Sequence, residues 1–179
     1  MSTPAASTDA ARTYAVTAVG PDAPGEVAAL AEVLAGLGAS LADASMTRLR
    51  GHFAMTLVAE LPAGSADRGA VQAALEAAGT GLHVVVWELD PAAEPPAVGP
   101  AYRLTVHGAD RPGIVAELAR TVARFGGNIT DLTCRLAGGL YVVAVEVDLP
   151  TTDGLEQALQ ALRASGLQVH LEPADEDVL

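Results

Sequence analysis

One short loop in this sequence carries residues that could bind a small polar ligand. It consists of Asp110, Arg111, Pro112 and Gly113 and lies between an alternating segment and a helical pattern. The backbone N–H groups at a helix start lack intrahelical partners and attract anions such as a carboxylate. Gly113 lets a ligand approach the backbone, and the Asp110 carboxylate can accept a hydrogen bond from an ammonium group. The loop could therefore hold both ends of an amino acid.

The same four residues also suit a purely structural role. An aspartate can cap the helix that follows, a proline fits its first turn, and a glycine permits unusual backbone angles. Spacing alone leaves both interpretations open. Elsewhere, the four histidines lack the paired spacing of metal ligands, and Cys134 takes the place that Met46 has in the first half of the chain. We therefore expect no catalytic residue, no metal site and no cofactor.

The loop belongs to a unit that the chain contains twice. At an offset of 88, residues 14–62 align with residues 102–150 without a gap. The aligned identities include pairs that chance does not bring together: Gly20/Gly108, Asp22/Asp110, Pro24/Pro112, Gly25/Gly113 and Asp43/Asp131. A proline-rich segment, 90–100, separates the copies and is typical of a short, semi-stiff linker. We therefore predict two domains, at residues 13–90 and 101–172.

The second copy shows the expected elements most clearly. Apolar residues at strand or helix spacing predict strand, helix, strand, strand, helix and strand over residues 102–107, 114–125, 128–136, 141–147, 155–162 and 167–171. The two middle strands form a hairpin that turns at 137–139. The first copy repeats this order, and its first helix is expected to bury four apolar residues: Val27, Leu30, Leu34 and Leu37.

A unit with this order forms a four-stranded antiparallel sheet with both helices on one face, because the crossovers are right-handed. The predicted fold class is therefore α+β, with two ferredoxin-like βαββαβ units in tandem. The opposite face of each sheet and one edge strand remain open. An unpaired edge favours pairing between units, within one chain or across a homodimer.

The composition excludes several classes of protein. Ten basic residues against 22 acidic residues give a net charge of −12, which repels the phosphates of nucleic acid. No apolar run approaches the ~18 residues that a membrane-spanning helix needs, and the first residues lack the pattern of a signal peptide. We expect a cytoplasmic protein that contacts neither nucleic acid nor membrane directly.

Both halves of the chain resemble the ACT domain, a regulatory βαββαβ module that binds amino acids. The resemblance rests on Gly-Ala-Asp-Arg-Pro-Gly-Ile-Val at 108–115 and on Phe-Gly-Gly-Asn-Ile at 125–129. Two such units in tandem are similar to the glycine cleavage system transcriptional repressor group. The resemblance implies a regulator without enzymatic activity that senses an amino acid effector and acts through a protein partner.

The resemblance also implies which residues touch the effector. In ACT domains that bind ligands, the effector usually lies between two units, against the loop glycine and an asparagine that opens the second strand. The implied site consists of Asp110, Arg111, Pro112, Gly113, Asn128 and Ile129. In the first copy, Glu26 replaces Ile114 and Ser40 replaces Asn128. Because Glu26 would repel a carboxylate, we expect the ligand in the second copy.

Three functions therefore compete. The leading hypothesis is an amino-acid-responsive regulator that controls transcription or an enzyme through protein contacts. A second is an interaction module without a ligand. A third is a small enzyme resembling acylphosphatase, because Arg111 and Asn128 match its arginine in the first loop and its asparagine on the following strand. Asp110 would repel a phosphate there, which disfavours the enzyme.

Overall fold

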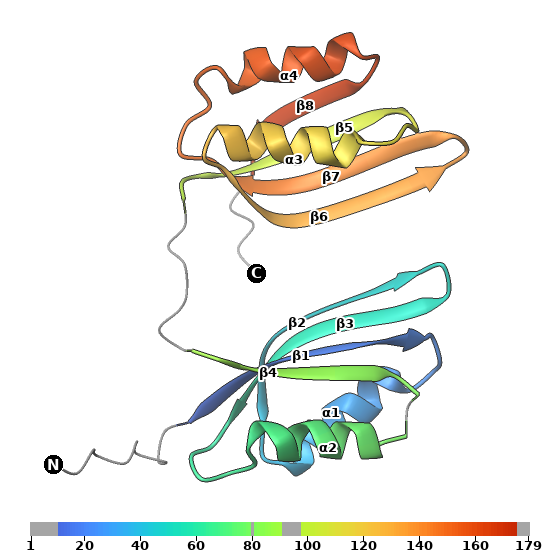
Figure 1. Cartoon of the computed structure of the whole chain (residues 1–179), viewed down its shortest axis with the longest axis vertical. Helices are drawn as coiled ribbons and strands as arrows, with labels where there is room; N and C mark the ends of the chain where they lie inside the picture. Colours follow the sequence, from blue (N-terminus) through green and yellow to red (C-terminus); the bar gives the residue numbers. More distant parts are fainter. Residues whose placement is uncertain (1–10, 80, 91–97, 175–179) are drawn as a thin grey trace, which may run out of the picture. The chain divides into compact units, whose positions relative to one another are not determined.

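The computed structural model describes residues 11–79, 81–90 and 98–174, which form two compact units divided between residues 94 and 95 (Figure 1). We call them unit 1 and unit 2 in chain order. Each unit has the predicted order of strand, helix, strand, strand, helix and strand, so the predicted α+β fold is confirmed. Residues 91–97, most of the expected linker, lie outside the described residues. The domain bounds 13–90 and 101–172 stay predictions.

Unit 1 is a four-stranded antiparallel sheet with the strand order β2-β3-β1-β4. Both of its helices cover the same face of the sheet (Figure 1). Its elements are β1 (Arg12–Pro21), α1 (Glu26–Gly36), β2 (Ser40–Leu49), β3 (His52–Leu61), α2 (Arg68–Ala77) and β4 (His83–Leu89). Burial alternates along β1 and β3, as expected for strands with one face toward the helices.

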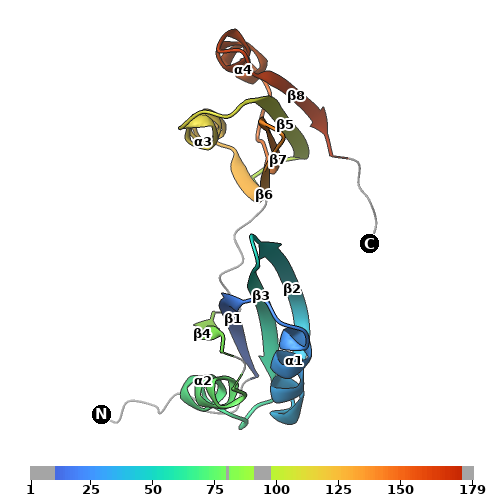
Figure 2. The same ribbon diagram turned by 90° about the vertical axis from the view of Figure 1, so that its right-hand side faces the viewer.

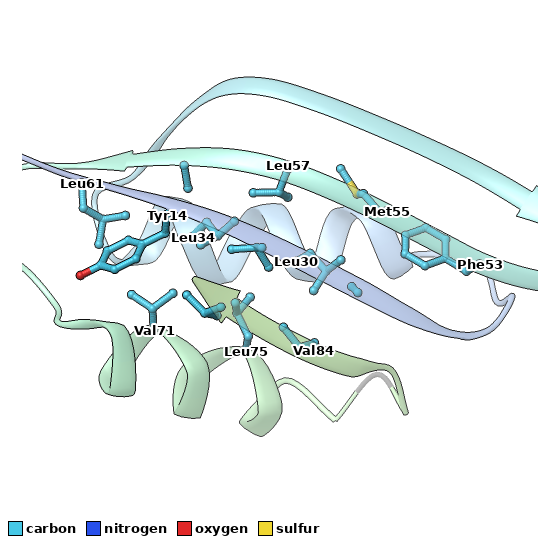
Figure 3. Close-up of a cluster of buried hydrophobic side chains, with 14 residues drawn as sticks. Tyr14, Leu30, Leu34, Phe53, Met55, Leu57, Leu61, Val71, Leu75 and Val84 are labelled. Carbon is cyan, nitrogen blue, oxygen red and sulfur yellow. The ribbon is translucent and has the colours of Figure 1, made fainter. Parts of the chain in front are cut away.

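The core of unit 1 lies between the sheet and its two helices. Its large buried side chains, drawn in Figure 3, include Tyr14, Leu30, Leu34, Phe53, Leu57, Leu61 and Leu75. Burying an apolar side chain of this size contributes roughly 1.5–3 kcal/mol, so this layer is the main source of stability. Gln72 adds a polar link between α2 and β4. Its Nε2 donates to the Val84 carbonyl at 2.7 Å, and its Oε1 accepts from the Val86 N–H at 2.9 Å.

Unit 2 repeats the architecture with the strand order β6-β7-β5-β8. Its helices lie together on one face of the sheet (Figures 1 and 2). Its elements are β5 (Ala101–Ala109), α3 (Ile114–Arg124), β6 (Asn128–Ala137), β7 (Leu140–Asp148), α4 (Leu155–Ala164) and β8 (Gln168–Pro173). The buried core is almost wholly aliphatic and includes Leu104, Val106, Ile114, Leu118, Val122, Val143, Val145, Leu149, Leu155 and Leu159.

The buried stripe of α1 differs from the prediction. Leu30 and Leu34 are buried and Leu37 packs partly against the core, but Val27 is 43% exposed. Glu26 takes the buried position instead. The reason is helical geometry, because residues four apart share a face, and Glu26 continues the row of Leu30 and Leu34. The predicted role of Val27 in the core was therefore wrong.

The edge strands β2 and β6 are open to solvent along most of their length. Both carry large exposed side chains, among them Met46 on β2 and Leu136 on β6. Both also contain the same irregularity near their start, between Leu41 and Asp43 in β2 and between Ile129 and Asp131 in β6. The repeat therefore includes the register shift of the edge strand. The expected open edges are present in each unit.

Candidate ligand pockets

The predicted loop of unit 2 connects the end of β5 to the start of α3. Gly113 is the N-cap of α3 and has a φ of 94°, in the left-handed region that favours glycine. Its carbonyl accepts from the Glu117 N–H at 2.8 Å, and no side chain caps the helix. The structural interpretation, in which Asp110 caps the helix, therefore does not hold, and Pro112 precedes the helix rather than lying in its first turn. The backbone turns at Gly113 without a side-chain cap, which leaves Asp110 free of that structural role.

A pocket of about 670 Å³ opens beside this loop. It is lined by Asp110, Arg111, Pro112, Gly113, Ile114, Val115, Ala116, Ala119 and Tyr141. The first four were predicted as site residues, and the structure brings them together around the first turn of α3. The small residues of α3 leave room over the helix, and Tyr141 at the start of β7 forms part of the wall.

The other two predicted site residues lie at the opposite end of the strands of unit 2. Asn128 begins β6 and pairs with Asp148, whereas the loop follows Ala109, which pairs with Leu140 at the other end of β7. The 11 residues of α3 span the distance between these two ends of the sheet, because a helix of that length is about 16 Å long. Within unit 2, the structure therefore does not bring Asn128 and Ile129 to the loop. Their contact with a ligand stays a prediction.

Arg111 is held by a set of hydrogen bonds that we call the loop clamp: Arg111, Glu117 and Ser165. Two guanidinium nitrogens donate to the two carboxylate oxygens of Glu117 at 3.0 and 2.8 Å, and one of them also donates to Ser165 Oγ at 3.0 Å. The hydrogen bonds from Arg111 lower the pKa of Glu117 below its ordinary value. Because the Arg111 charge is already paired, a ligand carboxylate would meet mainly the backbone N–H groups.

Sequence reasoning missed three contributors to this site. Glu117 is six residues from Arg111, and Ser165 reaches the loop from the end of α4, so no local pattern joined them. Tyr141 appeared only as a strand residue. Its hydrogen bond with Cys134, followed by partial burial and the charge of nearby groups, raises the pKa of Tyr141 above its ordinary value. Cys134 thus supports a residue of the pocket wall.

Unit 1 has a matching pocket of about 530 Å³. It is lined by Asp22, Ala23, Gly25, Glu26, Val27, Ala28, Ala31, Met46 and Phe53. Gly25 has a φ of 97° and caps α1 as Gly113 caps α3. The side chains differ, because Ala23 stands where Arg111 does and Glu26 where Ile114 does. The two pockets therefore have a similar backbone conformation and differ in the charge of their side chains.

Two further properties concern the described residues alone. No group of three or more histidine, cysteine or acidic side chains among them could hold a metal ion. None of the helices in the described ranges combines the length and the apolar run that crossing a membrane requires.

The fold and the repeated loop define a class of protein: small βαββαβ modules arranged in tandem. The chain belongs to the ACT-domain family, because residues 13–86 and residues 102–164 each match a sequence model of the ACT domain. The two matches cover both units. The predicted resemblance to tandem ACT domains is therefore confirmed.

The chain is also similar to individual proteins and solved structures. A UPF0237 protein from Methanosarcina mazei is 36% identical over 73 residues, which are 41% of this chain and 79% of that protein. The crystal structure of an unknown protein from Galdieria sulphuraria has a TM-score of 0.78 at 25% identity, over 92% of this chain and 99% of that one. A candidate glycine cleavage system transcriptional repressor has a TM-score of 0.66 at 16% identity, over 90% of this chain and 96% of that one. The last likeness concerns the fold alone.

Proposed function

We propose that this protein is a regulator that binds a small amino acid at the loop of unit 2 and acts on transcription or on an enzyme through protein contacts, without catalysing a reaction. The observation that carries the proposal is the pocket at residues 110–113. There, a left-handed glycine and the free N–H groups of a helix start lie beside an aspartate that caps nothing. Membership of the ACT-domain family supports the regulatory role.

The ligand's two charged ends have separate partners in this proposal. Its carboxylate accepts hydrogen bonds from the first N–H groups of α3, at Ile114 and Val115, which have no intrahelical acceptor. Its ammonium group donates to Asp110. The small side chains of Ala116 and Ala119 limit the ligand to a short side chain. The loop clamp holds Arg111 away from the carboxylate and fixes the loop against α4.

The net charge of the chain favours a protein partner over nucleic acid. With a net charge of −12, the chain has little attraction for DNA or RNA, so control of transcription would pass through another protein. The fold likeness to a candidate glycine cleavage system repressor makes glycine the first amino acid to test.

Calorimetric titration of the full chain with each of the twenty amino acids tests the proposal. Gly113→Ala should abolish binding, because its Cβ would lie over the N–H groups and strain the left-handed backbone. Gly25→Ala is the matched control, since Gly25 has the same conformation in unit 1 and carries the same folding penalty. Binding that survives Gly113→Ala, or is lost only with Gly25→Ala, would refute the assignment of unit 2.

Asn128 and Ile129 remain in the proposal on the resemblance alone. Asn128→Ala should remove a hydrogen bond of roughly 1 kcal/mol, or about fivefold in affinity, while Ser40→Ala should leave affinity unchanged. An unchanged affinity in Asn128→Ala would restrict the site to the loop. If no amino acid binds the wild type, the interaction module without a ligand becomes the better proposal. Hydrolysis of an acyl phosphate by the full chain would instead favour the enzyme.

A further inference from the structure

The pocket of unit 1 contains a buried acidic side chain that the proposed function does not use. Glu26 is the first residue of α1, lines the pocket and is only 7% exposed. Throughout residues 11–79, 81–90 and 98–174, no side chain or backbone group forms a hydrogen bond or ion pair with its carboxylate, whose oxygens keep a small contact with solvent. A carboxylate on a side chain this buried normally has a protein partner, because losing most of its hydration is costly.

The other charges at the pocket do not supply that partner. Asp22, the second acid of the lining, forms an ion pair with Arg48 at 3.3 Å. The lining contains no basic residue, and Ala23 stands where unit 2 has Arg111. The nearby arginine is thus already paired with Asp22, and no basic side chain of the described residues pairs with Glu26.

Packing and helix electrostatics do not explain Glu26 either. Ile114 is 1% exposed at the matching place in unit 2, so the fold accepts an apolar residue there. A carboxylate in the first turn gains from the helix dipole, but the exposed first-turn position of Val27 would give the same gain without burying the side chain. A residue that the fold does not need, buried without a partner at the wall of a pocket, indicates a ligand of opposite charge.

We propose that the unit 1 pocket binds a small organic cation, a primary ammonium group on a short apolar chain, with Glu26 as its counter-charge. The rest of the lining suits the apolar chain: Val27, Ala28, Ala31, Met46 and Phe53. The pocket of unit 2 lacks this buried glutamate, because Ile114 replaces it, and the acid of that pocket, Asp110, is the proposed partner of the amino acid. This inference goes beyond the proposed function and does not depend on it, since the amino acid was placed in unit 2.

Nuclear magnetic resonance titration of the full chain with n-butylammonium chloride tests the inference. The amide signals of residues 25–28 should shift and saturate, whereas sodium butyrate should not move them and n-butanol should act only weakly. Because butylammonium has no carboxylate, it lacks the group that the helix start of unit 2 would bind. The result is therefore independent of whether an amino acid binds there.

Two variants and a control complete the test. Glu26→Gln should weaken butylammonium binding tenfold or more, the order expected for a charged hydrogen bond. Glu26→Ile installs the residue that unit 2 already buries at this place, so it should fold and lose binding as well. Glu32→Gln removes an equal charge from the exposed side of α1 and should bind as the wild type does. Equal shifts with butanol and butylammonium, unchanged binding in Glu26→Gln, or no shift at residues 25–28 would each overturn the inference.

Discussion

Arg111 and Glu117 illustrate how single residues set the properties of the unit 2 loop. The planar guanidinium of Arg111 matches both oxygens of the carboxylate, which is a geometry that lysine cannot reproduce. Both side chains are about one-third exposed, so water and salt weaken the pair. Its main effect is therefore to orient the loop rather than to add much stability.

The pair makes stability depend on pH. The pKa of Glu117 is lower in the folded protein than in the unfolded chain, so its contribution is present above the unfolded pKa and is lost as the pH falls through the folded pKa. We expect the Tm of the wild type to exceed that of Glu117→Gln at pH 7, and the two curves to converge below about pH 4. Thermal unfolding between these pH values measures the difference. A constant difference down to pH 3 would show that the carboxylate charge is not the cause.

Tyr141 offers a second test at the residue scale. Its hydrogen bond with Cys134 is the main cause of its raised pKa. Cys134→Met introduces the residue that unit 1 has at this place, Met46, and removes that hydrogen bond. Spectrophotometric titration should then show Tyr141 ionising closer to the ordinary tyrosine value, with Tyr141→Phe identifying its signal. An unchanged titration would mean that burial, not Cys134, holds the phenol protonated.

At the scale of elements, the helices differ in how they begin. α1, α3 and α4 start at a left-handed glycine without a side-chain cap, whereas Asp67 caps α2 and accepts from the Ala70 N–H at 2.8 Å. Asp67→Ala should therefore lower the free energy of unfolding of unit 1 by about 1 kcal/mol. Glu32→Ala removes a charge from an exposed helix position and should change it by less than about 0.5 kcal/mol. Urea unfolding of both variants compares them, and equal effects would contradict a capping role for Asp67.

The order of elements could be predicted from sequence because it depends on local periodicity and on the repeat. The alternation of apolar and polar residues along 102–107 predicts a strand, and the glycine pair within 137–139 predicts the turn of the hairpin. The helix starts were harder, because an Asp-x-Pro-Gly run suits either aspartate or glycine as the cap. Glu26 was missed in the core because a charged residue is rarely buried without a partner. Ser165 comes to the loop only through the packing of α4, which no local pattern encodes.

For the whole molecule, the open edges of both sheets lead to a prediction about assembly. Long exposed edge strands with large apolar side chains tend to pair with another strand. We expect a homodimer, with a mass in light scattering of twice the 18.1 kDa of one chain. Leu136→Lys places a charge on β6, where Leu136 is 49% exposed, and should shift the population toward monomer without loss of stability. A monomeric wild type across the micromolar range would contradict the prediction.

The three side chains of the loop clamp are replaced together in unit 1 by three alanines: Ala23, Ala29 and the C-cap residue Ala78. Arg111 is the common partner of Glu117 and Ser165 in the clamp, so what these two contribute through it depends on Arg111 and is non-additive with its loss. After Arg111→Ala, a further change of Glu117 to alanine should alter the Tm little, although Glu117→Ala alone lowers it. Unit 1 therefore shows that this fold forms with alanine at all three positions. It is the natural comparison for a variant of unit 2 in which the whole clamp is replaced by alanine.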